Sequence, residues 1–172
     1  MRRLIAAFTA GALALGIIAG PALAKQPAKS PTIVDVAIAV NSDGPFAGSF
    51  DTLIELVVDL GLAPALSQNG QLTVFAPTDD AFDALFSALG VSSADEARAA
   101  LGDDAVRNVV LYHVAKGERY AADVVTSSQI RMLNGDFAMV DGATIDGANI
   151  IVTDVDAPTN GIIHVVDAVL LP

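Results

Sequence analysis

The chain has 172 residues and no cysteine, and its nine basic and twenty acidic residues give a formal net charge of −11. This acidic balance disfavours nucleic acid and anionic lipid as partners, because both are negatively charged. The lack of cysteine excludes disulfides, thiol nucleophiles and thiolate metal ligands.

Residues 1–24 have the pattern of a secretory signal peptide. Arg2 and Arg3 precede an uncharged apolar run, and small residues at 22 and 24 favour cleavage after Ala24. An uncleaved membrane anchor is the alternative, since the apolar run is long for a leader. Cleavage would leave seven basic against twenty acidic residues, a net charge of −13. No other stretch is long and apolar enough for a bilayer, so we expect a secreted or periplasmic protein without stable membrane insertion.

Residues 25–31 are polar and rich in proline, which predicts a flexible lead-in. The next stretch, 32–40, has apolar residues at helical spacing behind Thr32, a residue type that often caps helices. Turn-forming residues fill 41–48 and predict a loop. We therefore expect one domain, 32–172, that begins with a short helix.

A second helix is predicted from Phe50 to Gly61. Its apolar residues recur at helical spacing, and a glycine is common just after a helix end. These apolar residues are Phe50, Leu53, Ile54, Val57 and Leu60. Carboxylates lie four residues apart on the other side, at Asp51, Glu55 and Asp59. Since no histidine joins them, we interpret them as a solvated face rather than a metal or acid–base site.

The stretch 72–89 predicts a strand, a turn and a helix in direct succession. Apolar and β-branched residues favour a strand at 72–75, and Pro77 should end it because proline lacks a backbone N–H. Thr78 then suits the N-cap position, while Asp79 and Asp80 suit the first turn of the helix. Apolar residues at helical spacing follow at Phe82, Leu85, Phe86 and Leu89. We interpret this stretch as the structural hinge between helices and sheet.

Two more helices are predicted between 92 and 113. Ser92 or Ser93 can cap the first, which would end near Gly102. In the second, apolar positions recur at helical spacing through Val106, Val109, Val110 and His113. This spacing places His113 on the buried stripe and Tyr112 on a different face.

The remaining chain changes from helical to extended patterning. Short extended segments are predicted at 129–133, 137–140, 143–145, 148–155 and 161–171. Asn-Gly or Asp-Gly pairs separate them, and such pairs supply the positive φ angles of two-residue hairpin turns, so we expect an antiparallel meander. Both faces of 161–171 are largely apolar, which predicts an internal strand. Helices followed by a sheet indicate the α+β class.

No pattern for catalysis or cofactor binding is present in the sequence. It has no G-x-S-x-G elbow and no phosphate-binding glycine loop. It also has no calcium loop with alternating aspartates, and Asp154 and Asp156 alone provide too few ligands for calcium. Zinc would need carboxylates beside His113 and His164. We interpret both histidines as core residues whose nitrogens are hydrogen-bonded, and His164 as neutral. No catalytic, cofactor or metal residue is therefore predicted.

Three stretches together resemble the fasciclin domain family of secreted adhesion modules. T-V-F-A-P-T-D-D-A-F at 73–82 resembles the first family signature, and N-G-I-I-H-V-V-D-A-V-L-L-P at 160–172 resembles the second. L-Y-H-V at 111–114 matches the Tyr-His element between them. The likeness covers about 32–172, and the chain looks like a single-domain bacterial member.

The resemblance implies a wedge of about seven β-strands with small helices packed along one edge. It implies adhesion candidates at Tyr112 and His113. It also implies a structural motif, formed by Thr73, Phe75, Pro77, Thr78, Phe82, Asn160, Gly161 and His164. The Asp-Ile sequence with which some animal members bind integrins is missing before the second signature, so integrin binding is not transferred.

The resemblance implies a non-catalytic protein that mediates cell adhesion or contact with a surface or matrix. The partner would be a protein or a polysaccharide. The alternative is a carrier of a small apolar ligand such as a lipid or pigment, since certain family members bind pigments. A carrier would have a cavity lined by residues such as Phe82, Phe86 and Phe137.

Overall fold

The computed structural model describes residues 32–67, 71–157 and 161–172. The predicted signal peptide (1–24), the lead-in (25–31) and Asn160 lie outside these residues. The helices are α1 (Ile33–Ser42), α2 (Asp51–Asp59), α3 (Ala63–Leu66), α4 (Asp79–Leu89), α5 (Ala94–Leu101), α6 (Asp103–Tyr112) and α7 (Ala121–Thr126). The strands are β1 (Leu72–Pro77), β2 (Val114–Lys116), β3 (Gln129–Arg131), β4 (Phe137–Asp141), β5 (Thr144–Ile145), β6 (Ala148–Ala157) and β7 (Gly161–Val166). The predicted α+β class is confirmed.

Helix starts follow the predicted capping residues. Thr32 caps α1 and forms a capping box, in which Asp35 Oδ2 accepts the Thr32 N–H at 2.7 Å. Thr78 caps α4, and Ser93 caps α5. Gly61 follows α2 with φ +64°, a left-handed conformation that suits glycine. Local side-chain caps therefore set the starts of α1, α4 and α5.

Helix α2 receives its N-terminal cap from another segment. Its own N-cap residue is Phe50, which has no side-chain acceptor. Asp79 fills this role: its carboxylate accepts the backbone N–H groups of Asp51 at 3.1 Å and Thr52 at 2.9 Å. The predicted role of Asp79 at the start of α4 is thus joined by a second role, because the same carboxylate ties α4 to α2.

The seven strands form one sheet in the order β2-β1-β7-β6-β5-β4-β3. The antiparallel meander from β3 to β7 is confirmed, and β7 lies inside the sheet, parallel to β1 on its other side. An Ala115–Met132 bridge joins β2 to β3, so the two ends of the sheet meet. This closure leaves little free strand edge.

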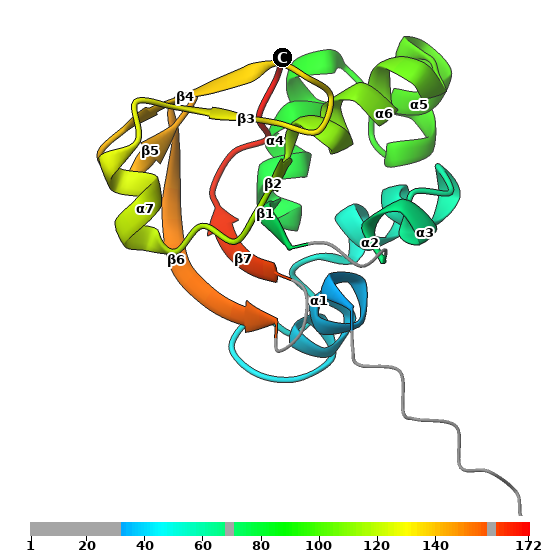
Figure 1. Cartoon of the computed structure of the whole chain (residues 1–172). Coiled ribbons are helices and arrows are strands. Elements are labelled where there is room, and N and C mark those ends of the chain that lie inside the picture. Colours follow the sequence, from blue (N-terminus) through cyan, green and yellow to red (C-terminus); the bar gives the residue numbers. More distant parts are fainter. Residues whose placement is uncertain (1–31, 68–70, 158–160) are drawn as a thin grey trace, which may run out of the picture.

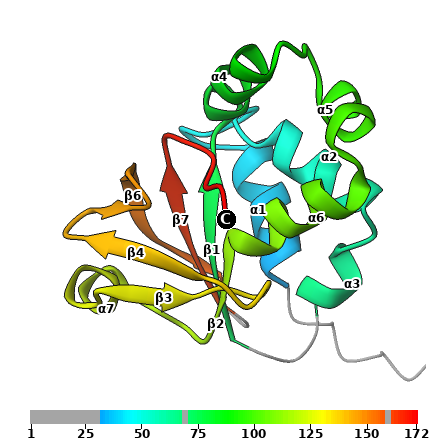
Figure 2. The same ribbon diagram turned by 90° about the horizontal axis from the view of Figure 1, so that it is seen from above.

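Helices α1, α2, α3, α5 and α6 lie in one half of the molecule, whereas β3, β4, β5, β6 and α7 lie in the other (Figure 1). Figure 2 shows α1, α2 and α6 on one side of β1 and β7, with β3, β4 and α7 on the other. The parallel β1–β7 pair is thus covered on both faces, which explains why every residue of both strands is buried.

Two details differ from the sequence prediction. The last strand ends at Val166 rather than near Leu171, and the segment from Asp167 onward leaves the sheet. Asp167 accepts the Asn149 N–H at 2.8 Å, which ties the departing segment to β6. The short elements β2, α3 and α7 were not predicted, because three to six residues carry too little periodicity to be recognised.

Two hydrophobic cores lie on opposite sides of β1 and β7. The helical-side core includes Leu53, Leu56, Val57, Val74, Phe82, Phe86, Val110, Ile163 and Val165. The sheet-side core consists of Phe75, Tyr112, Ala115, Val124, Ile130, Met132, Ala138, Val140, Ile145, Ala148, Val166 and Leu170. Alternate residues of β1 and β7 therefore contribute to different cores.

Candidate functional site

Tyr112 and His113 end helix α6 at the junction of the two cores. The Tyr112 side chain is 4% exposed and packs in the sheet-side core, whereas His113 is 1% exposed and faces the helical side. The predicted burial of His113 is confirmed, as is the placement of Tyr112 on a different face. Neither side chain is exposed to a partner, so any role in adhesion must act through the segments that they hold.

His113 is a buried, neutral histidine whose two ring nitrogens bind backbone groups. Nδ1 donates to Val109 O at 2.8 Å, and Nε2 accepts the Leu170 N–H at 2.9 Å. Burial lowers the pKa of His113 to about 4. His113 thereby fastens the C-terminal segment to α6 without offering a free nitrogen for catalysis.

Tyr112 connects α6 to the β4–β5–β6 region. Its hydroxyl donates to Asp146 Oδ2 at 2.5 Å and lies 3.2 Å from Phe137 O. Asp146 also accepts the Met139 N–H at 2.7 Å and has a φ of +46° in the turn between β5 and β6. Burial, with the Asp146 carboxylate next to it, raises the pKa of the Tyr112 hydroxyl. Tyr112 therefore holds strand β4 in place.

His164 plays a comparable part on the sheet side. Its ring is 0% exposed and stacks on Phe75, with ring centroids 5.4 Å apart. Nε2 donates to Arg119 O at 2.8 Å, and Nδ1 accepts the Asp154 N–H at 3.3 Å. Burial lowers the pKa of His164, so the side chain is neutral as predicted.

The other motif residues that the structure describes hold neighbouring segments. Thr73 is 0% exposed, and its hydroxyl donates to Gly117 O at 2.8 Å and accepts the Arg119 N–H at 2.9 Å. At Gly161, a Cβ atom would collide with the Leu72 carbonyl oxygen, so only glycine fits. Pro77 ends β1, and Phe82 is buried in the helical-side core.

The outer face of β3 and β4 exposes an apolar patch. Arg131 pairs with Phe137, and Gln129 with Met139, so these four side chains lie on one face of the sheet. Phe137 and Met139 are 51% and 59% exposed, and the Arg131 guanidinium lies 5.9 Å from the centre of the Phe137 ring. We call these four residues the β3–β4 patch. The sequence pattern predicted that Phe137 and Met139 lie in a strand, but it did not predict that their side chains would be exposed to solvent.

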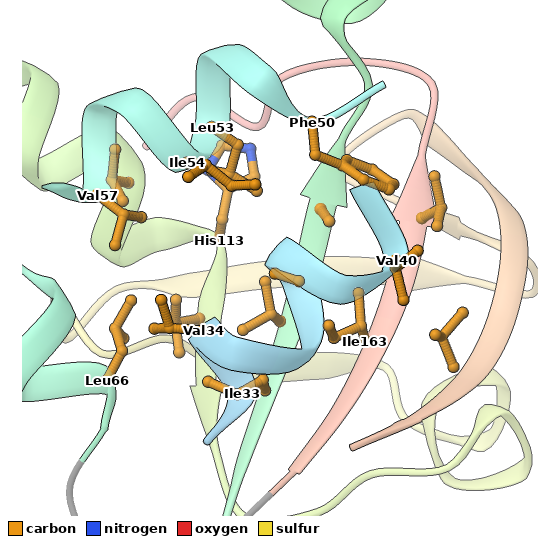
Figure 3. A pocket seen from close by; sticks show the side chains of 17 residues that line it. Ile33, Val34, Val40, Phe50, Leu53, Ile54, Val57, Leu66, His113 and Ile163 are labelled. Carbon is orange, nitrogen blue, oxygen red and sulfur yellow. The ribbon is translucent and has the colours of Figure 1, made fainter. Parts of the chain in front are cut away.

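Two apolar cavities lie on the helical side. The smaller, of about 50 Å³, lies beneath α1 and α2 and is lined by residues that include Phe50, Leu53 and His113 (Figure 3). The larger, of about 240 Å³, lies among α2, α4, α5 and α6 and includes Phe82, Phe86 and His113 in its walls. Phe137 does not line either of these two cavities, so that part of the carrier prediction is wrong: its strand faces solvent at the other end of the sheet.

Within residues 32–67, 71–157 and 161–172, no group of three or more histidine, aspartate or glutamate side chains is placed to hold a metal ion. None of the helices in these ranges combines the length and apolarity that a bilayer crossing requires. Asp51 and Asp59 are exposed at the two ends of α2, and Glu55 is exposed between them, as expected for a solvated face.

Comparison with known proteins identifies the family. The sequence profile described as "Fasciclin domain" matches residues 48–172 of this chain. Protein sll1483 of Synechocystis sp. is 35% identical over 155 residues, which cover 88% of this chain and 80% of that protein. The transforming growth factor-beta-induced protein ig-h3 of Sus scrofa is 32% identical over 129 residues, which cover 72% of this chain and 18% of that protein.

The fold has a counterpart among solved structures. A FAS1 domain pair from the insect cell adhesion molecule Fasciclin I superposes with a TM-score of 0.59 at 18% sequence identity, covering 82% of this chain and 51% of that chain. At this identity the likeness supports the fold alone, and it agrees with the seven-stranded sheet and flanking helices. The profile match over 48–172, together with the 35% identity to protein sll1483, shows that this chain belongs to the fasciclin domain family.

Proposed function

We propose that this protein is a secreted or periplasmic, non-catalytic protein that mediates adhesion to a cell surface or matrix. The observation that carries the proposal is the β3–β4 patch, with Phe137 51% and Met139 59% exposed beside Arg131. Aromatic, methionine and arginine side chains are enriched where proteins bind one another. Its family relatives include an insect cell adhesion molecule.

In this proposal, Tyr112 and His113 act indirectly. Tyr112 binds Phe137 O and, through Asp146, the Met139 N–H, so it fixes the strand whose outer face forms the patch. His113 fixes the C-terminal segment through the Leu170 N–H. A rigid patch loses less conformational entropy on binding, which favours affinity.

Binding of the labelled protein to native cells and isolated extracellular matrix tests the proposal. The double variant Phe137→Ser, Met139→Ser should bind at least about tenfold more weakly, because buried aromatic anchors often contribute 2 kcal/mol or more. Val58→Ser is the matched control, since Val58 is 57% exposed on α2 and lies outside the patch. Equal binding by the parent and the double variant would reject the patch, and no binding by the parent would reject adhesion.

A carrier of a small apolar ligand is the second candidate, and the 240 Å³ cavity favours it. Apolar cavities of about 150 Å³ bind small apolar molecules such as benzene. Both nitrogens of His113 are already bonded, so this side chain offers a ligand no polar contact. Mass spectrometry of solvent extracts from the native protein tests this function, and the absence of any lipid or pigment would contradict it.

A further inference from the structure

The larger apolar cavity on the helical side is open to solvent. Its volume is about 240 Å³, and it lies within a ring of helices in which α2 contacts α4, α4 contacts α5, α5 contacts α6 and α6 contacts α2. Three of the side chains that line it, Leu89, Leu101 and Leu171, are 43%, 49% and 56% exposed. These leucines therefore form a rim from which the cavity can be entered. We call the cavity and this rim the helical groove.

The helical groove has room for an apolar side chain of a partner. Its floor includes Phe82, Phe86 and Val110, which are buried in the helical-side core. Since a cavity of about 150 Å³ can hold benzene, this one has room for a leucine or phenylalanine side chain. Exposed apolar patches of this kind mark interaction sites in soluble proteins. An inserted side chain would fill the cavity and cover the rim leucines, as anchor residues do in protein interfaces.

The helices around the helical groove are acidic. Helices α4, α5 and α6 carry seven carboxylates, three on α4 and two on each of the others, against two arginines, which gives a net charge of −5. Arg98 is already paired, because its Nη1 lies 2.9 Å from Asp59 and its Nε donates to Asp103 at 2.9 Å. Asp103 and Asp104 follow the rim residue Leu101 by two and three positions, so carboxylates lie beside the apolar rim. This charge favours a basic partner and repels an acidic one.

We propose that the helical groove binds a basic amphipathic helix of a protein partner. One leucine or phenylalanine of this helix fills the cavity, and its lysines and arginines lie against the carboxylates of α4, α5 and α6. An amphipathic helix combines these two contacts, because one of its faces is apolar and the flanks of that face are charged. The groove is separate from the β3–β4 patch, so this site goes beyond the proposed adhesion function.

Calorimetric titration of the protein with two synthetic peptides tests the assignment. The first peptide is an amphipathic helix built of leucine and lysine only, and the second has glutamate in place of every lysine. The lysine peptide should bind, and the glutamate peptide should not, because the carboxylates around the groove repel it. Binding of the lysine peptide should weaken as salt is added, since salt screens exposed charges.

Two double variants test whether the peptide binds in the groove. Leu89→Ser, Leu101→Ser should raise the Kd of the lysine peptide by about tenfold or more, because it removes apolar surface that the peptide would cover. Ile38→Ser, Ile151→Ser is the matched control, since these side chains are also 43% and 49% exposed but lie outside the groove. Both double variants keep the net charge, so a difference between them cannot come from general electrostatic attraction.

Ala97→Leu provides a second groove variant if the leucine double variant fails to fold. Ala97 lines the cavity and is 5% exposed, so a leucine there takes up the space for the partner's side chain and leaves the rim unchanged. This variant should also raise the Kd of the lysine peptide. If it bound the peptide as the parent does, but lost a lipid or pigment found in extracts of the parent, the cavity would belong to the carrier function and the assignment would be overturned.

No binding of the lysine peptide, equal binding of the two peptides, or equal weakening by the groove and control variants would also overturn the assignment. These results are distinct from a failure of the adhesion proposal, which is tested on native cells and matrix. A protein that binds the lysine peptide but no native surface keeps the groove and loses adhesion. A protein that binds native surfaces but not the lysine peptide keeps adhesion and loses the groove.

Discussion

The two cores of this molecule share β1 and β7 but differ in how they are packed. The helical-side core contains cavities of about 50 and 240 Å³, both lined by apolar side chains and His113. The sheet-side core is enclosed by the rolled sheet and includes Tyr112, whose hydroxyl is hydrogen-bonded. Close-packed protein interiors have few voids larger than a water molecule, so the helical-side core is loosely packed where these cavities lie.

Each side also contains one buried, neutral histidine. His113 binds Val109 O and the Leu170 N–H, and His164 binds Arg119 O and the Asp154 N–H. In both, the two ring nitrogens bind backbone groups from different segments. The comparison indicates that histidine serves here as a buried cross-link, which requires the neutral form in which one nitrogen donates and the other accepts.

The largest expected effect is that of a charge on the sheet side. His164→Lys should lower the free energy of unfolding by about 3 kcal/mol or more, because it buries an ammonium group in a position that is 0% exposed and removes the acceptor of the Asp154 N–H. Thermal unfolding followed by circular dichroism measures this effect. A variant that melts within a degree or two of the parent would show that position 164 is not a closed core site.

Acid should weaken the protein through the helical-side histidine. The pKa of His113 is about 4 in the fold, against about 6.5 when unfolded, so between these values the unfolded chain binds a proton that the native chain does not. The free energy of unfolding should therefore fall by roughly 3 kcal/mol as the pH drops from 6.5 to 4. The lowered pKa of His164 acts in the same direction.

Urea unfolding at pH 7 and pH 4.5 measures this dependence. His113→Gln keeps a side-chain donor and acceptor but does not titrate. The free energy of unfolding should therefore change less between pH 7 and pH 4.5 in this variant than in the parent. Identical pH dependence in the parent and His113→Gln would contradict the assignment of the effect to His113.

A matched pair of substitutions compares the packing of the two cores directly. Ala138→Leu on β4 should cost about 1–3 kcal/mol, because Ala138 is 0% exposed among the residues of the sheet-side core and a larger side chain there must displace its neighbours. Ala97→Leu on α5 should be nearly neutral or stabilising, because Ala97 lines the 240 Å³ cavity. Equal destabilisation, measured by urea unfolding, would show that the helical side is as tightly packed as the sheet side.

The smallest loss of stability among the destabilising changes is expected at the hydroxyl that links α6 to the β5–β6 turn. Tyr112→Phe should lower the free energy of unfolding by about 1 kcal/mol, since Asp146 is exposed and can exchange its lost partner for water. Hydrogen exchange should show faster opening around Phe137 and Met139 than in the parent, with β1 unchanged. Unchanged exchange in β4 would mean that Tyr112 does not hold this strand.

Most helices and the meander could be predicted from the sequence because their causes are local. Thr32, Thr78 and Ser93 cap helices that begin within one residue, and the Asp146-Gly147 turn needs only its own backbone angles. The burial of His113 followed from helical spacing alone. The family, and through it the wedge, was recognised from three short stretches in the correct order.

Long-range features had no local signal. The parallel β1–β7 pair joins Leu72 to Gly161, and the Asp79 carboxylate caps a helix that begins 28 residues earlier in the chain. The Tyr112 hydroxyl bonds to Asp146, and Thr73 and His164 bond to the backbone of Arg119. Helix caps, hairpin turns and helical spacing depend on residues within a few positions of one another, so the local sequence was sufficient to predict them. Which distant groups meet was decided only by tertiary packing, because those hydrogen bonds join residues that are tens of positions apart in the chain.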